Sequence, residues 1–304
     1  MIDIGPQVKS DESFVAQCRL HQSKYRATIL KEECGYGPTV NSKTPYGNYL
    51  LNGENTGNNF ISETAFQYAK QRVRDKVICP ELTIDTYRLF NNMLSSMPLC
   101  FNLFSDLRDL LLNNPTECST VVKALFKELT WIVSVEYVGV EFIPIPTEDY
   151  IDDKSAFDAI FIVKDSFGKH GIISIETKYT DLLGKNTSSK NDRKNLIIQE
   201  DSLFSDEITH QLLREGYRQI YRNFLLTYTY AKRNRMANFA NVIISPKEDI
   251  LSIQEYEELS RGLRNLKKVI FKTDLDEFLE RGICSGVNKI ADVFTRIKER
   301  YIPE

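Results

Sequence analysis

The chain lacks the residue patterns that several common functional classes require. Its three histidines lie far apart, at positions 21, 170 and 210, and its six cysteines form no Cys-x-x-Cys pair. Because zinc centres use Cys and His ligands at close spacing, this pattern argues against a zinc protein. Scattered cysteines also favour a reducing, cytoplasmic environment over an oxidising one.

Long apolar runs are missing as well. No segment reaches the roughly 18 consecutive apolar residues that suggest a membrane-spanning helix. The first residues, MIDIGPQVKSDESF, contain no apolar signal core. We therefore expect a cytoplasmic protein that has no membrane partner.

The chain has no excess of positive charge. Its 304 residues carry a formal net charge of −3, so no global basic field indicates nucleic-acid binding. Any contact with phosphate must come from a local patch. The hydrophobic fraction of 42% and the charged fraction of 27% are those of an ordinary globular protein with enough length to bury a core.

Two apolar, β-rich runs carry the most informative local pattern. AFDAIFIV (156–163) and GIISIETKY (171–179) flank DSFGKH (165–170), which has strong turn chemistry. This arrangement predicts an antiparallel hairpin. If Asp158 lies opposite Glu176, the midpoint of the loop falls on Phe167, in the middle of the proposed turn.

The hairpin register decides which side chains meet. Side chains alternate between faces with a period of two, so Asp158, Glu176 and Lys178 share one face. Directly opposed carboxylates have Cβ atoms about 5 Å apart and repel each other. A divalent cation would offset that repulsion, and Mg²⁺ prefers oxygen ligands of this kind. The other interpretation is a chance match, because D…ExK is short and occurs in many chains.

The remaining periodicity predicts a mixed central sheet with helices on both faces. Residues 1–60 are expected to be irregular. The expected helices are 60–77, 84–94, 106–112, 119–129, 206–231, 253–266 and one or two at the C-terminus. The expected strands are 132–145, the two hairpin strands, 241–245 and 268–272.

Two polar segments near the hairpin leave alternatives open. Residues 181–201 contain Lys185, Lys190, Arg193 and Lys194, which predicts either a plain solvated loop or a mobile loop that closes over a polyanion. On the 206–231 helix, three polar residues lie beside the apolar stripe and form either a site-facing patch or a structural hydrogen-bonding patch: Gln219, Arg222 and Asn223.

Several segments together resemble a bacterial branch of the restriction-endonuclease-like PD-(D/E)XK superfamily. The segments are QSKYR (22–26), RLFNNMLSSMPLCFNLF (88–104), SAFD (155–158), IETKYTD (175–181) and QIYRNFLL (219–226). The resemblance covers residues 20–250. The 88–104 run is its most specific part, although its apolar composition favours a packing role.

The resemblance implies an α/β fold with an αβββαβ core, a mixed central sheet flanked by helices and a helical N-terminal extension. The expected division is a mainly helical region (1–115) packed on a nuclease core (116–304) that carries a C-terminal αβα extension, or one continuous domain. The oligomeric state stays open, with a homodimer as one alternative.

The resemblance also implies site residues. Asp158 and Glu176 would be the metal ligands, Lys178 the catalytic lysine, and Gln219 a further catalytic residue that faces the metal site. Relatives often add an upstream acidic residue, for which Glu128 and Glu141 are both candidates. The chain departs from the family pattern at one point, because Phe157 replaces the proline before Asp158.

The expected function is hydrolysis of DNA phosphodiester bonds with Mg²⁺, or with Mn²⁺ as a substitute, in restriction, phage defence or repair. Two alternatives remain at this stage. One is a catalytically inactive module that binds nucleic acid or protein on the same fold, against which the intact Asp158, Glu176 and Lys178 argue. The other is an RNA-directed nuclease.

Overall fold

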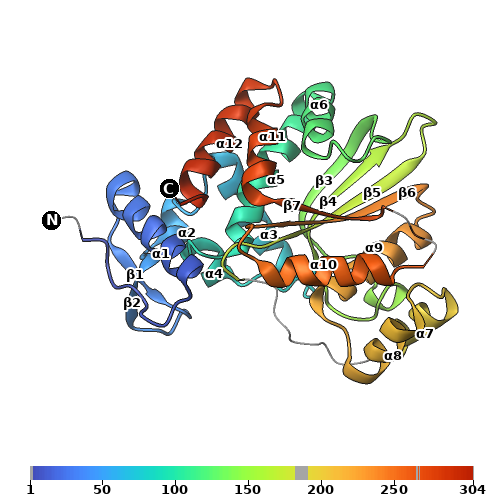
Figure 1. Ribbon diagram of the computed structural model, residues 1–304. Helices are drawn as coiled ribbons and strands as arrows, with labels where there is room; N and C mark the ends of the chain where they lie inside the picture. Colours follow the sequence, from blue (N-terminus) through green and yellow to red (C-terminus); the bar gives the residue numbers. More distant parts are fainter. Residues whose placement is uncertain (1–2, 182–190, 265, 267, 304) are drawn as a thin grey trace.

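A five-stranded sheet forms the centre of the structure (Figure 1), which is a computed structural model that describes residues 3–181, 191–264, 266 and 268–303. In spatial order the strands are β3 (Ser134–Phe142), β4 (Phe157–Lys164), β5 (His170–Thr177), β6 (Asn238–Ser245) and β7 (Ile270–Asp274). The first three are antiparallel, and β6 and β7 run parallel to β5. The predicted mixed sheet is therefore confirmed.

Helices cover both faces of this sheet (Figure 1). One face packs against α3 (Glu63–Ile78), α5 (Ser96–Asn113), α6 (Pro115–Leu125), α11 (Leu275–Ile283) and α12 (Asn288–Tyr301). The other face packs against α7 (Asp192–Glu200), α8 (Asp206–Glu215), α9 (Gln219–Arg233) and α10 (Ile250–Gly262). Within the described part of the chain, every helix is too short or too polar to traverse a lipid bilayer.

Two hydrophobic cores result, one on each side of the sheet. The first contains edge-to-face aromatic pairs such as Phe104 with Phe161, whose ring centroids are 5.6 Å apart. The second lies under α9, where Phe224 packs near Phe204 with a centroid distance of 5.7 Å. The sheet is therefore buried on both faces, as the apolar runs of its inner strands predict.

The expectation of an irregular N-terminal segment is wrong. Residues 1–60 contain α1 (Ser13–Tyr25), a π-helical turn (Arg26–Leu30), the hairpin of β1 (Cys34–Gly37) with β2 (Thr44–Leu50), and α2 (Gly53–Thr56). The buried residues of α1 are Cys18, Gln22 and Ser23, so the helix has no apolar stripe that a periodicity argument could detect. A short helix, α4 (Thr86–Asn91), and a 3₁₀ turn (Thr147–Asp149) complete the helices and strands of the described residues.

Helix α5 begins earlier than the sequence suggests. The predicted helix 106–112 is only its second half, because the apolar 96–105 segment is also helical. Ser95 caps the helix by accepting a hydrogen bond from the Met97 amide at 3.2 Å. Pro98 lies in the first turn, where a missing amide N–H costs little.

The next helix, α6, also begins earlier than expected. It starts at Pro115 instead of the predicted position 119, and Asn114 caps it by accepting a hydrogen bond from the Glu117 amide at 3.2 Å. Ser119 lies inside the helix and donates back to the carbonyl of Pro115 at 2.7 Å. Pro115 then occupies the first helical position, which its fixed φ favours.

The predicted single helix 206–231 is two helices, α8 and α9. Gly216 separates them with a φ of 90°, a conformation that favours glycine. Apolar residues keep helical spacing across the break, which is why periodicity did not reveal it. The break places Gln219 at the first position of α9, at the edge of the sheet where β5 ends.

The predicted 181–201 loop is partly helical. Residues 182–190, including Lys185 and Lys190, lie outside the described residues, but Asp192–Glu200 form α7. Asn191 caps this helix by accepting a hydrogen bond from the Lys194 amide at 2.8 Å. Lys194 is not solvated, since its side chain is 1% exposed and forms an ion pair with Asp153.

Candidate active site

Three carboxylates occupy neighbouring positions on strands β3, β4 and β5. Strand β4 pairs Ala159 with Ile175 of β5, so the next step of the same register places Asp158 opposite Glu176. Strand β3 pairs Val140 and Phe142 with residues 159 and 157, which places Glu141 opposite Asp158. The predicted hairpin register is confirmed, and Glu141 extends the row to a third strand.

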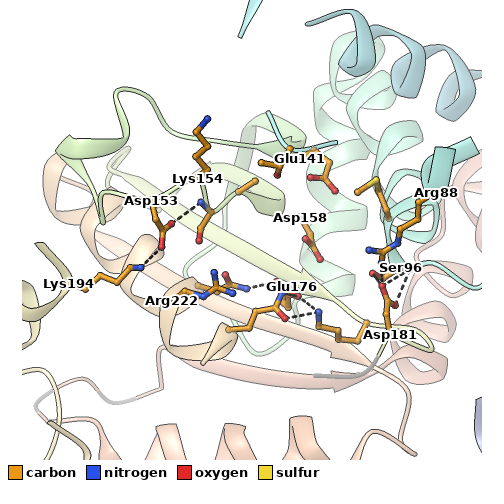
Figure 2. Close-up of a pocket in the computed structure, with 17 residues that line it drawn as sticks. Arg88, Ser96, Glu141, Asp153, Lys154, Asp158, Glu176, Asp181, Lys194 and Arg222 are labelled. Carbon is orange, nitrogen blue, oxygen red and sulfur yellow. Dashed lines mark hydrogen bonds and ion pairs between the residues drawn. The ribbon is translucent and has the colours of Figure 1, made fainter. Parts of the chain in front are cut away.

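The row faces α9. Ala159 and Ile175, the neighbours of Asp158 and Glu176, point into the core on the α5 side. Strand alternation then directs both carboxylates to the opposite face, where α9 packs. Figure 2 shows Glu141, Asp158 and Glu176 directed into the same space.

Glu176 is held by three donors. Its Oε1 atom accepts hydrogen bonds from the Lys178 ammonium at 2.6 Å and from the Gln219 amide at 2.7 Å. Its Oε2 atom accepts one from the Asn223 amide. The side chain is only 4% exposed. Gln219 and Asn223 are one turn apart on α9, so one helix face fixes the orientation of this carboxylate.

Lys178 lies just beyond the end of β5. Its backbone amide still pairs with the carbonyl of Ile244 at 2.8 Å, which fixes the direction of its side chain. The ammonium donates to Glu176 and, at 3.1 Å, to the amide oxygen of Gln219. Burial favours the neutral amine, but attraction to Glu176 and Asp158 outweighs it and raises the pKa of Lys178. The lysine is therefore a fixed positive charge.

Asp158 is less constrained than Glu176. Its Oδ2 atom accepts a hydrogen bond from the Thr177 amide at 2.7 Å. Its Oδ1 atom has no hydrogen-bond partner among the residues that the structure describes, and the side chain lines the cavity. Desolvation and repulsion from Glu176 and Glu141 raise its pKa well above the usual aspartate range.

Glu141 is the upstream acidic residue that reaches this site. It has a φ of 52°, which is uncommon for a non-glycine residue, and Arg72 donates to its backbone carbonyl at 2.8 Å. Desolvation and the negative charge of Glu176 raise the pKa of Glu141 to about 7. The other candidate, Glu128, pairs with Arg281 at 2.6 Å instead.

These side chains line a polar cavity of about 700 Å³. Its walls are formed by Thr83, Arg88, Ser96, Met97, Glu141, Asp153, Lys154, Ser155, Ala156, Asp158, Glu176, Lys178, Asp181, Lys194, Gln219, Arg222 and Asn223. The cavity therefore lies between the row of carboxylates, α9, α7 and the start of α5. It brings together all four residues that the sequence singled out, Asp158, Glu176, Lys178 and Gln219.

The 88–104 segment both packs and lines this cavity. Most of its apolar residues, which include those in the first half of α5, are buried in the core, as the packing interpretation predicts. Its polar residues fasten the chain after β5, because Asp181 accepts hydrogen bonds from the Ser96 hydroxyl at 2.7 Å and from Arg88. The 88–104 segment thus anchors the chain three residues after Lys178.

The carboxylates form an open set of possible ligands. Among the described residues, no three His, Cys, Asp or Glu side chains lie close enough to share one metal ion. Mg²⁺ does not need such a cluster, since it usually binds through one or two carboxylates and keeps several waters. Asp158 and Glu176 are therefore the two candidate Mg²⁺ ligands.

Sequence reasoning missed several residues of the cavity. The Lys194–Asp153 ion pair joins α7 to the segment before β4, and no local pattern predicts that contact. Asp181 and Arg88 are 93 positions apart and pair only through the fold. Asn223, by contrast, was already part of the predicted patch, because its spacing of four from Gln219 places both on one helix face.

A comparison with protein families agrees with this geometry. A family model described as the PD-(D/E)XK nuclease superfamily matches residues 9–303. Neither the curated proteins nor the solved structures contain a significant match. The family match spans nearly the whole chain, including the three strands that carry the carboxylates and the helix that contacts Glu176. The chain therefore belongs to the PD-(D/E)XK nuclease superfamily.

Proposed function

We propose that this protein is a Mg²⁺-dependent deoxyribonuclease that hydrolyses phosphodiester bonds. One observation carries the proposal: Asp158 and Glu176, on adjacent antiparallel strands, face one polar cavity together with Lys178. A fold alone does not assign a function, but nuclease chemistry uses this combination of charges. Restriction, phage defence and DNA repair are the cellular roles that such an activity would serve.

The free lone pairs of the two carboxylates fit a metal ion. Each carboxylate oxygen can accept two hydrogen bonds. Glu176 Oε1 accepts two and Oε2 accepts one, so one site remains on Oε2. Asp158 keeps at least three sites, because only Oδ2 accepts a hydrogen bond from a described residue. Asp158 and Glu176 would therefore hold Mg²⁺, or Mn²⁺ in its place.

A bound Mg²⁺ ion would neutralise charge on the phosphate and lower the pKa of a bound water. The protein residues supply the remainder. Two N–H donors of Lys178 bind Glu176 and Gln219, which leaves the third for a phosphate oxygen or the attacking water. Because Lys178 is held as an ammonium ion, we assign it charge stabilisation and orientation of the water rather than proton abstraction.

Gln219 would act as a positioning residue. Its amide group donates to Glu176 and accepts from Lys178, so it fixes the relative orientation of the ligand and the catalytic cation. Glu141 faces the same cavity from β3 and would bind a water of the metal ion's hydration shell or a second ion.

A cleavage assay on supercoiled plasmid and linear DNA tests the proposed function. We expect cleavage with Mg²⁺ or Mn²⁺ and none with EDTA. Linear DNA with blocked ends separates internal cleavage from digestion at ends, and a single-stranded RNA of matched sequence tests the RNA-directed alternative. The matched control is Asp158→Asn, which keeps the hydrogen-bond acceptor for Thr177. Activity that survives in this variant, or in EDTA, would reject the assigned site.

A further inference from the structure

The charges around the cavity divide into paired and unpaired groups. Three cations are held in ion pairs: Arg88 with Asp181, Lys178 with Glu176, and Lys194 with Asp153. Four other charged side chains of the cavity form no ion pair with any described residue: the carboxylates Asp158 and Glu141, and the cations Lys154 and Arg222. The proposed metal would account for the unpaired carboxylates, and the unpaired cations need another explanation.

Arg222 is the more constrained of the two unpaired cations. It lies on α9 between Gln219 and Asn223 and lines the cavity, whereas Lys154 is exposed. Its Nε atom is shielded from solvent without a hydrogen-bond partner, and its other guanidinium nitrogens donate to no described residue. Leaving buried donors unsatisfied costs free energy, so the site favours an added acceptor.

A purely structural arginine in this protein has a different environment. The Nε atom of Arg300 also lacks a partner, but its two terminal nitrogens donate to the carbonyl of Asn58 at 2.9 Å and to the side chain of Asn59 at 2.8 Å. Arg26 donates to the carbonyl of Gly47 at 2.8 Å and to that of Asp3 at 3.1 Å. Arg222 has no such carbonyl acceptors, and its guanidinium is directed at a space that a ligand can enter.

We propose that Arg222 binds a phosphate group of the DNA strand next to the bond that is cut. The inference rests on the proposed nuclease function and deepens it. Arginine presents a planar fork of N–H donors that matches a phosphate bidentately. A chain with a net charge of −3 needs local sites of this kind to hold a polyanion.

The two unpaired cations lie on the same side of the carboxylates. In Figure 2, Arg222 and Lys154 lie on the Asp153 side of Asp158 and Glu176, and Arg88 lies on the other side. Asp181 neutralises Arg88. Net positive charge is therefore concentrated on the Arg222 side, so that side holds the flanking phosphate.

Binding measurements test the phosphate contact apart from cleavage. In a Lys178→Ala background with Mg²⁺, Arg222→Gln should weaken the binding of a short labelled DNA roughly 10–100-fold. It should also lower the slope of log K against log salt by about 0.7–0.9, the loss of one phosphate contact. Arg222→Lys should recover part of the affinity. Arg214→Gln, which removes the same charge from an exposed site outside the cavity, is the matched control and should bind as the background does.

Neutral methylphosphonate linkages locate the contacted phosphate. The linkages are placed one at a time along the DNA. The linkage beside the cut should slow cleavage by the wild-type protein, and it should not slow cleavage by Arg222→Gln any further. If wild-type protein cleaves DNA but Arg222→Gln keeps the affinity, the salt slope and the methylphosphonate pattern, the inference is wrong and the nuclease function stands. If wild-type protein neither binds nor cleaves DNA, both are wrong.

Discussion

Strands β3, β4 and β5 carry very different charge arrangements at their two ends. Beside the hairpin turn, Glu136 of β3 pairs with Lys164 of β4 and, at 2.8 Å, with His170 of β5. These hydrogen bonds hold the pKa of Glu136 below its usual range. At the opposite end, the same three strands present three carboxylates and one lysine.

The turn end shows the charge pairing expected where only the stability of the fold matters, and the cavity end does not. At the turn end, each charge has a partner of opposite sign, and the group is partly solvated. At the cavity end, Glu141 and Asp158 have no cation of their own, and burial together with repulsion between the carboxylates raises the pKa of both. An arrangement that disfavours the folded state without a ligand is expected at a functional site.

The largest difference in cleavage rate should appear when one carboxylate is replaced at the cavity end of the strands and one at the turn end. Asp158→Asn should reduce cleavage roughly a thousandfold or more, since it removes a ligand from the proposed metal site. Glu136→Gln, the matched change at the turn end, should leave cleavage unchanged. Single-turnover cleavage rates measure both. Equal losses in the two variants would mean that the ends are not functionally different.

The lysines give a second comparison. Lys178→Ala should lower the cleavage rate about 100–1,000-fold, because it removes a fixed charge at the scissile phosphate. Metal binding, followed by calorimetry, should persist because Lys178 is not a ligand. Lys164→Ala at the turn end is the control. A folded Lys178→Ala variant with full activity would refute the catalytic assignment.

Stability against pH sharpens the electrostatic contrast. In metal-free protein, the pKa of Glu141 rises from 4.5 to about 7, so the folded state binds its proton more tightly than the unfolded state. Its contribution is most favourable below pH 4.5 and is lost as the pH rises toward 7, at a cost on the order of 1–3 kcal/mol.

Glu141→Gln should therefore raise the urea midpoint at pH 8 relative to wild type in EDTA, with little change at pH 4. Glu136 has a lowered pKa, so its stabilisation is present at neutral pH and is lost on acidification. Glu136→Gln should accordingly lower the midpoint slightly at pH 8. If both substitutions shift the midpoint in the same direction at pH 8, the electrostatic contrast is absent.

The smallest predicted effect concerns the α9 contacts. Gln219→Ala should lower the cleavage rate about tenfold, because Glu176 and Lys178 lose a shared partner but keep each other. The metal affinity should change less than in Asp158→Asn. Gln211→Ala, at a partly exposed position on α8 outside the cavity, is the control. A loss as large as that of Lys178→Ala would indicate that Gln219 contacts the substrate itself.

The sequence predicted the cavity end better than the rest of the molecule. Strand alternation and turn chemistry depend on neighbouring residues, so the register of Asp158 and Glu176 could be worked out by counting. Helix α1 could not be detected, because its buried side chains include Gln22 and Ser23. The division between α8 and α9 was hidden because apolar spacing continues across Gly216.

Long-range pairs were also beyond sequence reasoning. Glu141 lines the cavity, whereas Glu128 pairs with Arg281 of α11 across 153 positions of the sequence. The sequence placed Lys194 in a polar loop, whereas in the structure it is buried on α7 and paired with Asp153. Such contacts depend on the tertiary fold, whereas local sequence patterns predict only helices, strands and turns.

The most direct test of the account is the position of a bound metal in crystals grown with Mn²⁺, located by anomalous scattering. The account predicts a peak within coordination distance of Asp158 and Glu176 and none beside Glu136. A peak beside Glu136 alone, or an ordered site in which Mn²⁺ contacts neither Asp158 nor Glu176, would contradict it.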